Sequence, residues 1–229
     1  MHDPFYDLFA RPALKPWTVN QIALLTIDMQ YLDAHRDGWI GRIAKAQGRE
    51  DRLEERFRAI DATVPNIRRL QHAFRAARQE VVHARLAYRK KDARDAGTAY
   101  LPSPEASPLP RNDRDDALLP EVCAAEDELI FSKVSSSVFS STDIDQVLRR
   151  MGISHLVLTG LTTDGCVELS ARDAADRGYS VTLVSDGCCA STTAAHEDAI
   201  QRMTDGGFLS AKTTDEAVRL VASIHTEMS

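Results

Sequence analysis

Cysteine is scarce in this sequence, with four in 229 residues, and no two of them have the C-x-x-C spacing. They lie at irregular intervals, at Cys123, Cys166, Cys188 and Cys189. A disulfide-stabilised fold needs more cysteines at regular spacings, and many structural zinc sites contain a C-x-x-C pair. The pattern argues against both classes. The adjacent Cys188 and Cys189 are interpreted as small packing residues, because a disulfide between neighbours would strain the peptide that joins them.

Long apolar runs and an excess of positive charge are also missing. No stretch approaches the roughly 18 apolar residues of a membrane-spanning helix, and the amino-terminal MHDPFYDLFARPALKPW contains no signal-peptide core. The 34 acidic residues outnumber the 28 basic ones, giving a formal charge of -6. That balance argues against binding to nucleic acid or to an anionic membrane surface. We expect a cytoplasmic protein whose partner is a small molecule.

The usual nucleotide-binding fingerprints are absent as well. No G-x-G-x-x-G occurs in the sequence. The segment from Gly160 to Val167 comes close to the phosphate loop G-x-x-x-x-G-K-[ST], but Cys166 and Val167 stand where that loop needs a lysine and a hydroxyl. A phosphate or nucleotide binder therefore remains as an alternative, which a nucleotide thermal-shift screen would test.

The sequence does contain a regular alternation of apolar strand and helix signals. Strands are predicted at 22–28, 80–86, 128–133, 156–160, 179–185 and 208–211, and helices from about Arg52, from Thr142 or Asp143, after Gly160, over 193–204 and over 215–225. The alternation predicts an α/β fold: a doubly wound, Rossmann-like parallel sheet of about six strands in an α-β-α sandwich. With 43% hydrophobic residues, residues 21–229 can form a single domain, although the length also permits two.

Three further stretches carry less regular signals. Residues 1–20 are rich in proline and are interpreted as an irregular arm that lies over the domain or reaches a neighbouring subunit. The Arg/Glu-rich part of residues 36–79 is interpreted as a solvated helix face, and Pro65 as the start of a fresh helix or a kink. Residues 97–120 hold five prolines, which predicts a long loop that serves as a lid or an oligomer contact.

The most informative stretch surrounds Cys166. An apolar run ends at Thr159-Gly160, and a helix follows, which Thr163 or Asp164 can cap and Gly178 can end in a left-handed conformation. Cys166 is thus predicted in the first turn of a helix just past the carboxyl end of a buried strand. The free N–H groups there stabilise a thiolate, and ligands bind at this edge of a parallel sheet. The alternative is a buried cysteine that only fills space.

Two more polar residues are predicted at the same edge of the sheet. Asp28 ends the strand IALLTID, and Lys133 ends ELIFSK. Singly, Asp28 would be interpreted as a turn former and Lys133 as a surface lysine. Together with Cys166 they form a chemically complementary set: a thiol, a base that can deprotonate it, and a cation that keeps the base ionised.

These residues lie in three blocks that resemble a known family. LLTIDMQ, SKVSSSVFSSTDIDQVL and LVLTGLTTDGCVELSARDAADRGYSVTLVSDG are similar to the motifs of the isochorismatase-like cysteine hydrolases. Within that family the chain resembles the amidohydrolase branch that contains N-carbamoylsarcosine amidase, biuret hydrolase and ureidoacrylate amidohydrolase. AYRKKDA, after the second strand, is similar to the N-carbamoylsarcosine amidase type. The resemblance runs from about residue 20 to the end.

The resemblance implies a catalytic triad and a reaction. Cys166 would be the nucleophile, Asp28 the general base and Lys133 the third member. The backbone N–H groups of Thr162 and Cys166 would form an oxyanion hole, beside a cis peptide between Leu161 and Thr162. The implied reaction is hydrolysis of a C–N bond in a small ureido, carbamoyl or amide compound through a thioester, with release of ammonia or an amine. It needs no cofactor.

The sequence departs from the family pattern in places, and these departures limit which reactions and sites the resemblance implies. Nicotinamidases of the family carry a metal-binding D-x-H and a further histidine after the second strand, where this chain has HARLAYRKKDARD, so no metal is expected. Tyr88 and Arg89 are candidates for substrate binding, with Arg89 facing a substrate carboxylate. We also expect a homo-oligomer, a dimer or a tetramer. A vinyl-ether hydrolase of the isochorismatase type and a non-catalytic binding or scaffold protein remain the alternatives.

Overall fold

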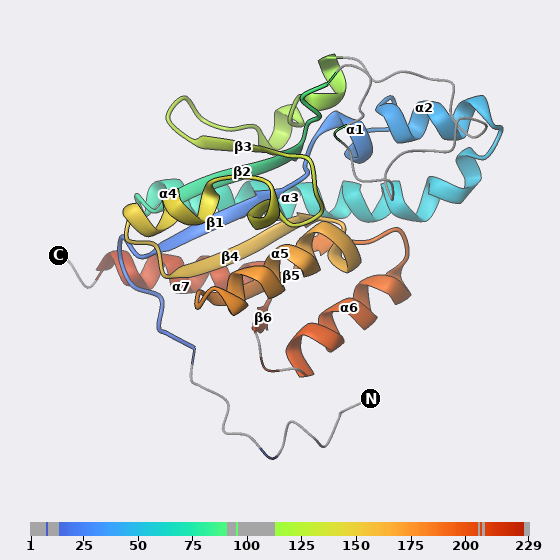
Figure 1. The fold of residues 1–229 in the computed structure, drawn as a ribbon. Coiled ribbons are helices and arrows are strands. Elements are labelled where there is room, and N and C mark those ends of the chain that lie inside the picture. The colour runs from blue at the N-terminus through green and yellow to red at the C-terminus, as the bar shows by residue number, and fades with distance from the viewer. Residues whose placement is uncertain are drawn as a thin grey trace.

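A six-stranded sheet in which all strands are parallel forms the centre of the computed structural model (Figure 1). The structure describes residues 8, 14–90, 95, 113–205, 207 and 209–226. The strands are β1 (Ile22–Ile27), β2 (Glu80–Leu86), β3 (Leu129–Lys133), β4 (His155–Leu161), β5 (Ser180–Cys189) and β6 (Ser210–Lys212). Their order is β3-β2-β1-β4-β5-β6, which confirms the predicted doubly wound sheet. The order reverses between β1 and β4.

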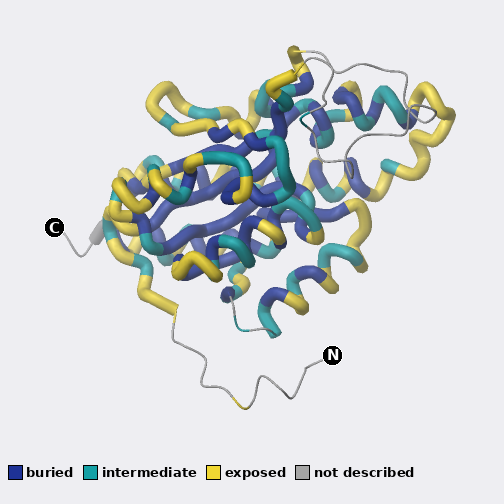
Figure 2. Tube along the Cα trace, in the orientation of Figure 1, coloured by how far each residue is buried: buried dark blue, intermediate teal, exposed yellow. Residues whose placement is uncertain are grey.

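The strands form because their apolar runs are buried on both faces. Every residue of β1 and β4 is buried, as the dark central layer in Figure 2 shows. Continuous apolar runs of this kind are typical of parallel strands covered by helices. The edge strand β3 differs, because Leu129 and Ile130 are 38% and 43% exposed. The buried strands β1 and β4 therefore form the centre of the sheet, and β3 pairs with β2 alone in the sheet order.

Helices cover both faces of the sheet. On one face α3 (Glu54–Ala76) and α7 (Thr214–Thr226) pack Leu70, Phe74 and Val221 against alternate residues of the central strands. On the other face α4 (Ile144–Arg150), α5 (Glu168–Asp176) and α6 (Thr193–Asp205) pack against the remaining alternate residues. The period of two along each strand divides its side chains between the two helical layers. No helix in the described ranges is long and apolar enough to cross a membrane.

Residues 31–60 build an extension beside the carboxyl edge of the sheet. It contains α1 (Tyr31–Ala34), α2 (Trp39–Ala46) and the first turns of α3. Pro65 lies inside α3, which continues through it, so it does not start a fresh helix. The proposed arm over residues 1–20 and the Pro-rich segment 97–120 fall largely outside the described residues.

The turn predicted at Asp186-Gly187 is wrong, because β5 continues through it to Cys189. Asp186 accepts hydrogen bonds from the backbone N and Oγ1 of Thr214, at 2.7 and 2.8 Å, and so ties β5 to the start of α7. A Cβ on Gly187 would approach the side chain of Thr159 to 3.1 Å, so the absence of a side chain lets β5 run close to β4.

The adjacent cysteines Cys188 and Cys189 both stay free. Cys188 packs into the core on the α5 side, whereas Cys189 packs with Met29 and Leu161 on the other face. Successive side chains of a strand point to opposite faces. The packing interpretation of this pair therefore agrees with the structure.

Candidate functional site

Three polar side chains from three strand ends meet at the carboxyl edge of the sheet. Lys133, the last residue of β3, donates from Nζ to Oδ2 of Asp28 at 2.8 Å and to Sγ of Cys166 at 3.3 Å. The same Nζ donates to the carbonyl oxygen of Ser135 at 3.1 Å. The group lies where the strand order reverses, which is the usual place for a ligand site in an open α/β sheet.

Lys133 is a buried cation rather than a surface lysine. Its side chain has no exposure, and that of Asp28 is 4% exposed. Burial alone would lower the pKa of Lys133, but the charge of Asp28 and the sulfur of Cys166 outweigh it and raise that pKa above its ordinary value. The ammonium group therefore keeps its charge, as a buried charge does when it is paired with an opposite one.

Asp28 turns into the site because of an unusual backbone conformation. Its φ is 53°, in the left-handed region that few residues other than glycine adopt. The backbone N of Asp28 donates to the carbonyl oxygen of Ala84 at 2.9 Å, so the hydrogen bonding to β2 extends one residue past β1. Its Oδ1 is buried and has no hydrogen-bond partner within the described ranges. One oxygen of this carboxylate thus binds Lys133 and the other is free to accept a proton.

Cys166 lies in a separate turn, Thr163–Val167, that precedes α5. The turn has π-helical bonding and bends at Gly165, whose φ of -132° and ψ of -105° are not helical. The backbone N of Gly165 and that of Val167 both donate to the carbonyl oxygen of Thr162, at 3.0 and 3.1 Å. The helical segment therefore begins with a turn that contains Cys166, as predicted, but Thr162 precedes that turn instead of Thr163 or Asp164 and makes no side-chain capping bond.

The expected cis peptide between Leu161 and Thr162 is also wrong, since no peptide within the described ranges is cis. A trans bond is favoured by about 3 to 4 kcal/mol at non-proline residues. The change of chain direction after β4 is made instead at Gly165, where a Cβ would lie 2.6 Å from Oγ1 of Thr162. The backbone N–H groups of Thr162 and Cys166 remain the predicted oxyanion hole.

Gly160 brings the Cys166 turn close to Asp28. It pairs with Ile27 in the sheet and has a φ of +116°. A Cβ at this position would lie 2.0 Å from the carbonyl oxygen of Ile27. Only glycine permits this approach of β4 to β1, which sets Asp28 and the Cys166 turn side by side.

The surroundings keep Cys166 as a neutral thiol. Burial raises its pKa above the ordinary value, the negative charge of Asp28 raises it further, and Lys133 opposes both. The stabilised thiolate expected from a helix amino terminus is therefore not the resting state, because burial and a carboxylate dominate over local N–H groups. A base must remove the proton when the thiol reacts.

Two polar residues that sequence reasoning passed over hold this edge together. Gln30 is buried; its Nε2 donates to the carbonyl oxygens of Leu86 and Asp115, and its Oε1 accepts from the backbone N of Leu86. His196 of α6 lies 2.8 Å from Oγ1 of the buried Thr163 and so fixes the Cys166 turn. Gln30 could have been found from its place in LLTIDMQ, whereas no local signal marks His196.

A third omission is Arg56. The sequence placed it on a solvated helix face, but the structure buries its side chain to 8% exposure. Its guanidinium contacts Asp33, which lies on α1 shortly after Asp28, and Ser191 beyond β5. The reason is tertiary: the first turn of α3 lies over the carboxyl edge of the sheet.

The two candidate substrate-binding residues lie past the end of β2, at the same edge. Tyr88 packs against the apolar cluster of Leu32, Trp39 and Leu86. Arg89 is exposed, and its Nη2 lies 3.4 Å from the carbonyl oxygen of Ser141. Their roles in binding stay predictions.

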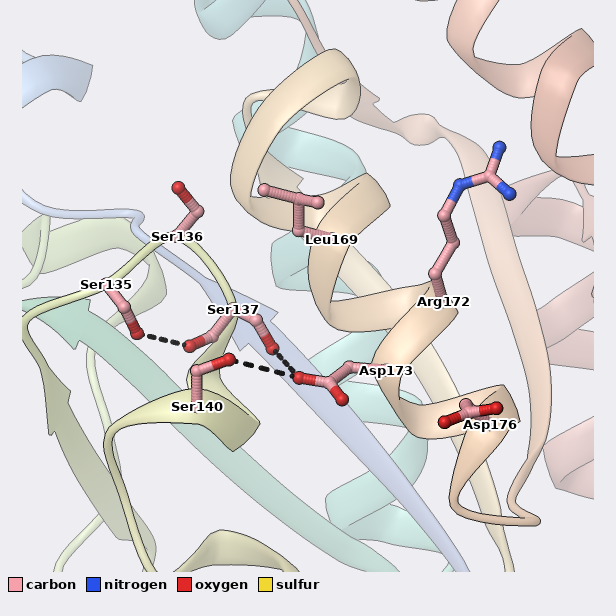
Figure 3. A pocket seen from close by; sticks show the side chains of 8 residues that line it. All are labelled: Ser135, Ser136, Ser137, Ser140, Leu169, Arg172, Asp173 and Asp176. Atoms are coloured by element: carbon pink, nitrogen blue, oxygen red, sulfur yellow. Dashed lines mark hydrogen bonds between the residues drawn. The ribbon is translucent and has the colours of Figure 1, made fainter. Parts of the chain in front are cut away.

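A pocket of about 540 Å³ opens between the loop after β3 and α5 (Figure 3). Its lining consists of four serines and four residues of α5: Ser135, Ser136, Ser137, Ser140, Leu169, Arg172, Asp173 and Asp176. Oδ2 of Asp173 accepts from the hydroxyls of Ser137 and Ser140 at 2.7 and 3.2 Å. Ser135 joins the pocket to the site, because its carbonyl oxygen binds Lys133.

Comparisons with solved structures show the same fold. A cysteine hydrolase from Pseudomonas syringae aligns with a TM-score of 0.77 and 24% identity, over 94% of this chain and all of that one. An N-carbamoylsarcosine amidase from Thermoplasma acidophilum aligns with a TM-score of 0.62 and 23% identity, over 85% of this chain and 97% of that one.

Sequence comparisons identify the family. A ureidoacrylate amidohydrolase from Pantoea ananatis is 29% identical over 183 residues, 72% of this chain and 68% of that protein. An N-carbamoylsarcosine amidase from Arthrobacter is 28% identical over 124 residues, 52% of this chain and 47% of that protein. Residues 22–215 match the isochorismatase domain. The chain therefore belongs to the isochorismatase family of hydrolases.

Proposed function

We propose that the chain is a cysteine-dependent amidohydrolase that cleaves a C–N bond of a small ureido, carbamoyl or amide compound through a thioester. The observation that supports it most directly is the placement of Lys133 Nζ between Asp28 Oδ2, at 2.8 Å, and Cys166 Sγ, at 3.3 Å. A thiol, a carboxylate and a buried cation in contact supply the groups that nucleophilic hydrolysis of an amide needs.

In the first half-reaction Asp28 acts as the base and then as the acid. Its free Oδ1 takes the proton of Cys166 as Sγ attacks the carbonyl carbon. The developing oxyanion accepts hydrogen bonds from the backbone N–H groups of Thr162 and Cys166. Asp28 then gives the proton to the leaving nitrogen, the C–N bond breaks, and ammonia or an amine departs from the thioester.

In the second half-reaction water replaces the sulfur. Asp28 takes a proton from the water as its oxygen attacks the thioester carbon. The C–S bond then breaks, the acid product leaves, and the proton returns to Sγ of Cys166. Lys133 stays charged throughout, because its pKa is raised above the ordinary value by Asp28 and Cys166 in spite of burial. It therefore balances whichever partner carries the negative charge.

The substrate class comes from the relatives. The matching proteins are named for ureidoacrylate and N-carbamoylsarcosine, which both carry a ureido or carbamoyl group. A panel of ureido acids, biuret-like compounds and simple amides, assayed for ammonia release, would test the proposal. We expect at least one ureido compound to be hydrolysed.

Replacing the nucleophile supplies the mechanistic test. Cys166→Ala and Cys166→Ser should abolish turnover while the fold persists, since either side chain fits the turn. Cys123→Ala is the matched control, because that cysteine is exposed and free, and its activity should equal that of the wild type. Activity in Cys166→Ala equal to the wild type would end the covalent mechanism.

A further inference from the structure

A second polar group, formed by Asp33, Arg56 and Ser191, bridges the carboxyl edge of the sheet beside the triad. Arg56 donates from Nη2 to Oδ2 of Asp33 at 3.1 Å and from Nη1 to Oγ of Ser191 at 3.0 Å. Its Nη2 and Nε also approach the carbonyl oxygen of Asp33, at 3.2 and 3.4 Å. The guanidinium therefore links the segment that carries Asp33 to the segment that carries Ser191.

This bridge of Asp33, Arg56 and Ser191 lies close to the end of the strand that leads into the Cys166 turn. Asp33 lies on α1 directly after β1 and Asp28, and Ser191 follows β5, whose last residue Cys189 pairs with Leu161. The bridge thus runs from the end of β1 to the end of β5, across the end of β4. That end is where the chain enters the turn that carries Cys166. Residues next to Arg56 in α3 pack on Met29, Leu161 and Cys189, which holds the bridge against the strand ends.

Asp33 has hydrogen-bonding capacity that the protein does not use. Its side chain is 20% exposed, yet Oδ1 is buried and has no partner within the described part of the chain. An unpaired buried acceptor is costly, and those that persist call for an explanation such as a ligand. Burial raises the pKa of Asp33 to about 6, the charge of Arg56 opposes that shift, and the charge of Asp28 adds to it. Near neutral pH the group is therefore a carboxylate.

We propose that Asp33 is a substrate-binding residue whose Oδ1 accepts a hydrogen bond from an N–H of the substrate, with Arg56 as the positioning residue that orients it. The inference rests on the proposed function and narrows its substrate class. Two carboxylates, Asp28 and Asp33, border this side of the site, and they favour an N–H donor over a carboxylate there. The substrate is a ureide or carbamoyl compound whose second carbonyl-bound nitrogen, the one that is not the leaving group, carries hydrogen and points towards Asp33.

The test compares two ureides that differ only at the carbonyl-bound nitrogen that is not the leaving group, which carries two hydrogens in the first and two methyl groups in the second. On the wild-type chain we expect the N–H compound to have a KM at least about 10-fold lower, because a site built for a donor rejects an analogue that lacks it. Asp33→Asn should raise KM for the N–H compound about 10-fold, as a charge-assisted hydrogen bond becomes a neutral one, and should change KM for the dimethyl compound little. The value of kcat should stay nearly constant.

The control is Asp61→Asn, which also removes a carboxylate paired to an arginine near the start of α3. Its partner Arg36 lies 2.7 Å away, and both side chains are more than half exposed. It should leave both KM values unchanged. Equal KM values for the two ureides on the wild type, or equal effects of Asp33→Asn on both, would overturn the inference and give Asp33 a structural role.

Binding to the Cys166→Ala chain, measured by calorimetry, separates this inference from the proposed function. The Cys166→Ala chain could bind the N–H compound more tightly than the dimethyl compound while the wild type hydrolyses no member of the panel. That result would refute the proposed hydrolysis and support the binding role of Asp33. If the wild type hydrolyses ureides but the Cys166→Ala chain binds both compounds equally, the proposed function stands and the role of Asp33 falls.

Discussion

Removing the charge of Lys133 tests the triad most sharply. Lys133→Met keeps the length of the stem and deletes the ammonium group. The structure then leaves Asp28 with neither oxygen paired, since Oδ2 loses its contact at 2.8 Å and Oδ1 has no partner within the described ranges. Breaking a buried ion pair in this way typically lowers the free energy of unfolding by about 3 to 5 kcal/mol.

The effect on activity has a defined pH signature. Without the cation, the pKa of Cys166 rises further, because Lys133 no longer opposes the effects of burial and of the charge of Asp28. The acidic limb of kcat/KM against pH should therefore shift to higher pH, and the rate should fall by on the order of 10² to 10⁴.

The double variant Asp28→Asn/Lys133→Met separates stability from mechanism. It contains no uncompensated charge, so it should recover much of the stability that Lys133→Met loses, and it should remain inactive. The assays are urea unfolding and kcat/KM against pH, on the best substrate of the panel, with folding checked by circular dichroism. A folded Lys133→Met chain with an unchanged pH profile would remove Lys133 from the mechanism.

Three further predictions concern single positions. Gly160→Ala should lower the free energy of unfolding by about 3 kcal/mol, because its Cβ would lie 2.0 Å from the carbonyl oxygen of Ile27. The control is Gly48→Ala, whose Cβ would have no atom within 4 Å and which should lower the free energy of unfolding by about 1 kcal/mol. Equal losses in the two variants would contradict this reasoning. Burial lowers the pKa of His155 to about 4, so as pH falls the unfolded chain binds a proton before the folded chain does. The free energy of unfolding should therefore fall by about 3 kcal/mol as pH drops from 6.5 to 4. His155→Gln should flatten this pH dependence in urea titrations, and an unchanged pH dependence would refute the prediction. Arg89→Gln should raise KM for an anionic substrate much more than for a neutral analogue, whereas equal effects would assign Arg89 to structure.

Most strands of the sheet could be predicted from the sequence because they are continuous apolar runs. Such runs can be recognised without tertiary information. Strand ends in turn placed Asp28, Lys133 and Cys166 at one edge, and the structure brings them into contact. The protonation of Cys166 could not be predicted, because it depends on burial and on Asp28, which come from elsewhere in the chain. The burial of Arg56 could not be predicted either, since a charged helix face does not show which arginine meets the sheet.

Lys133, the third member of the proposed triad, is carried by an edge strand of the described sheet. β3 pairs with β2 alone, and its Leu129 and Ile130 are more than a third exposed. Edge strands generally open at lower free energy than central ones. Detachment of β3 would withdraw Lys133 from Asp28 and Cys166 while β1 and β4 stay paired. The proposed mechanism therefore predicts that in mild denaturant the activity is lost before the fold.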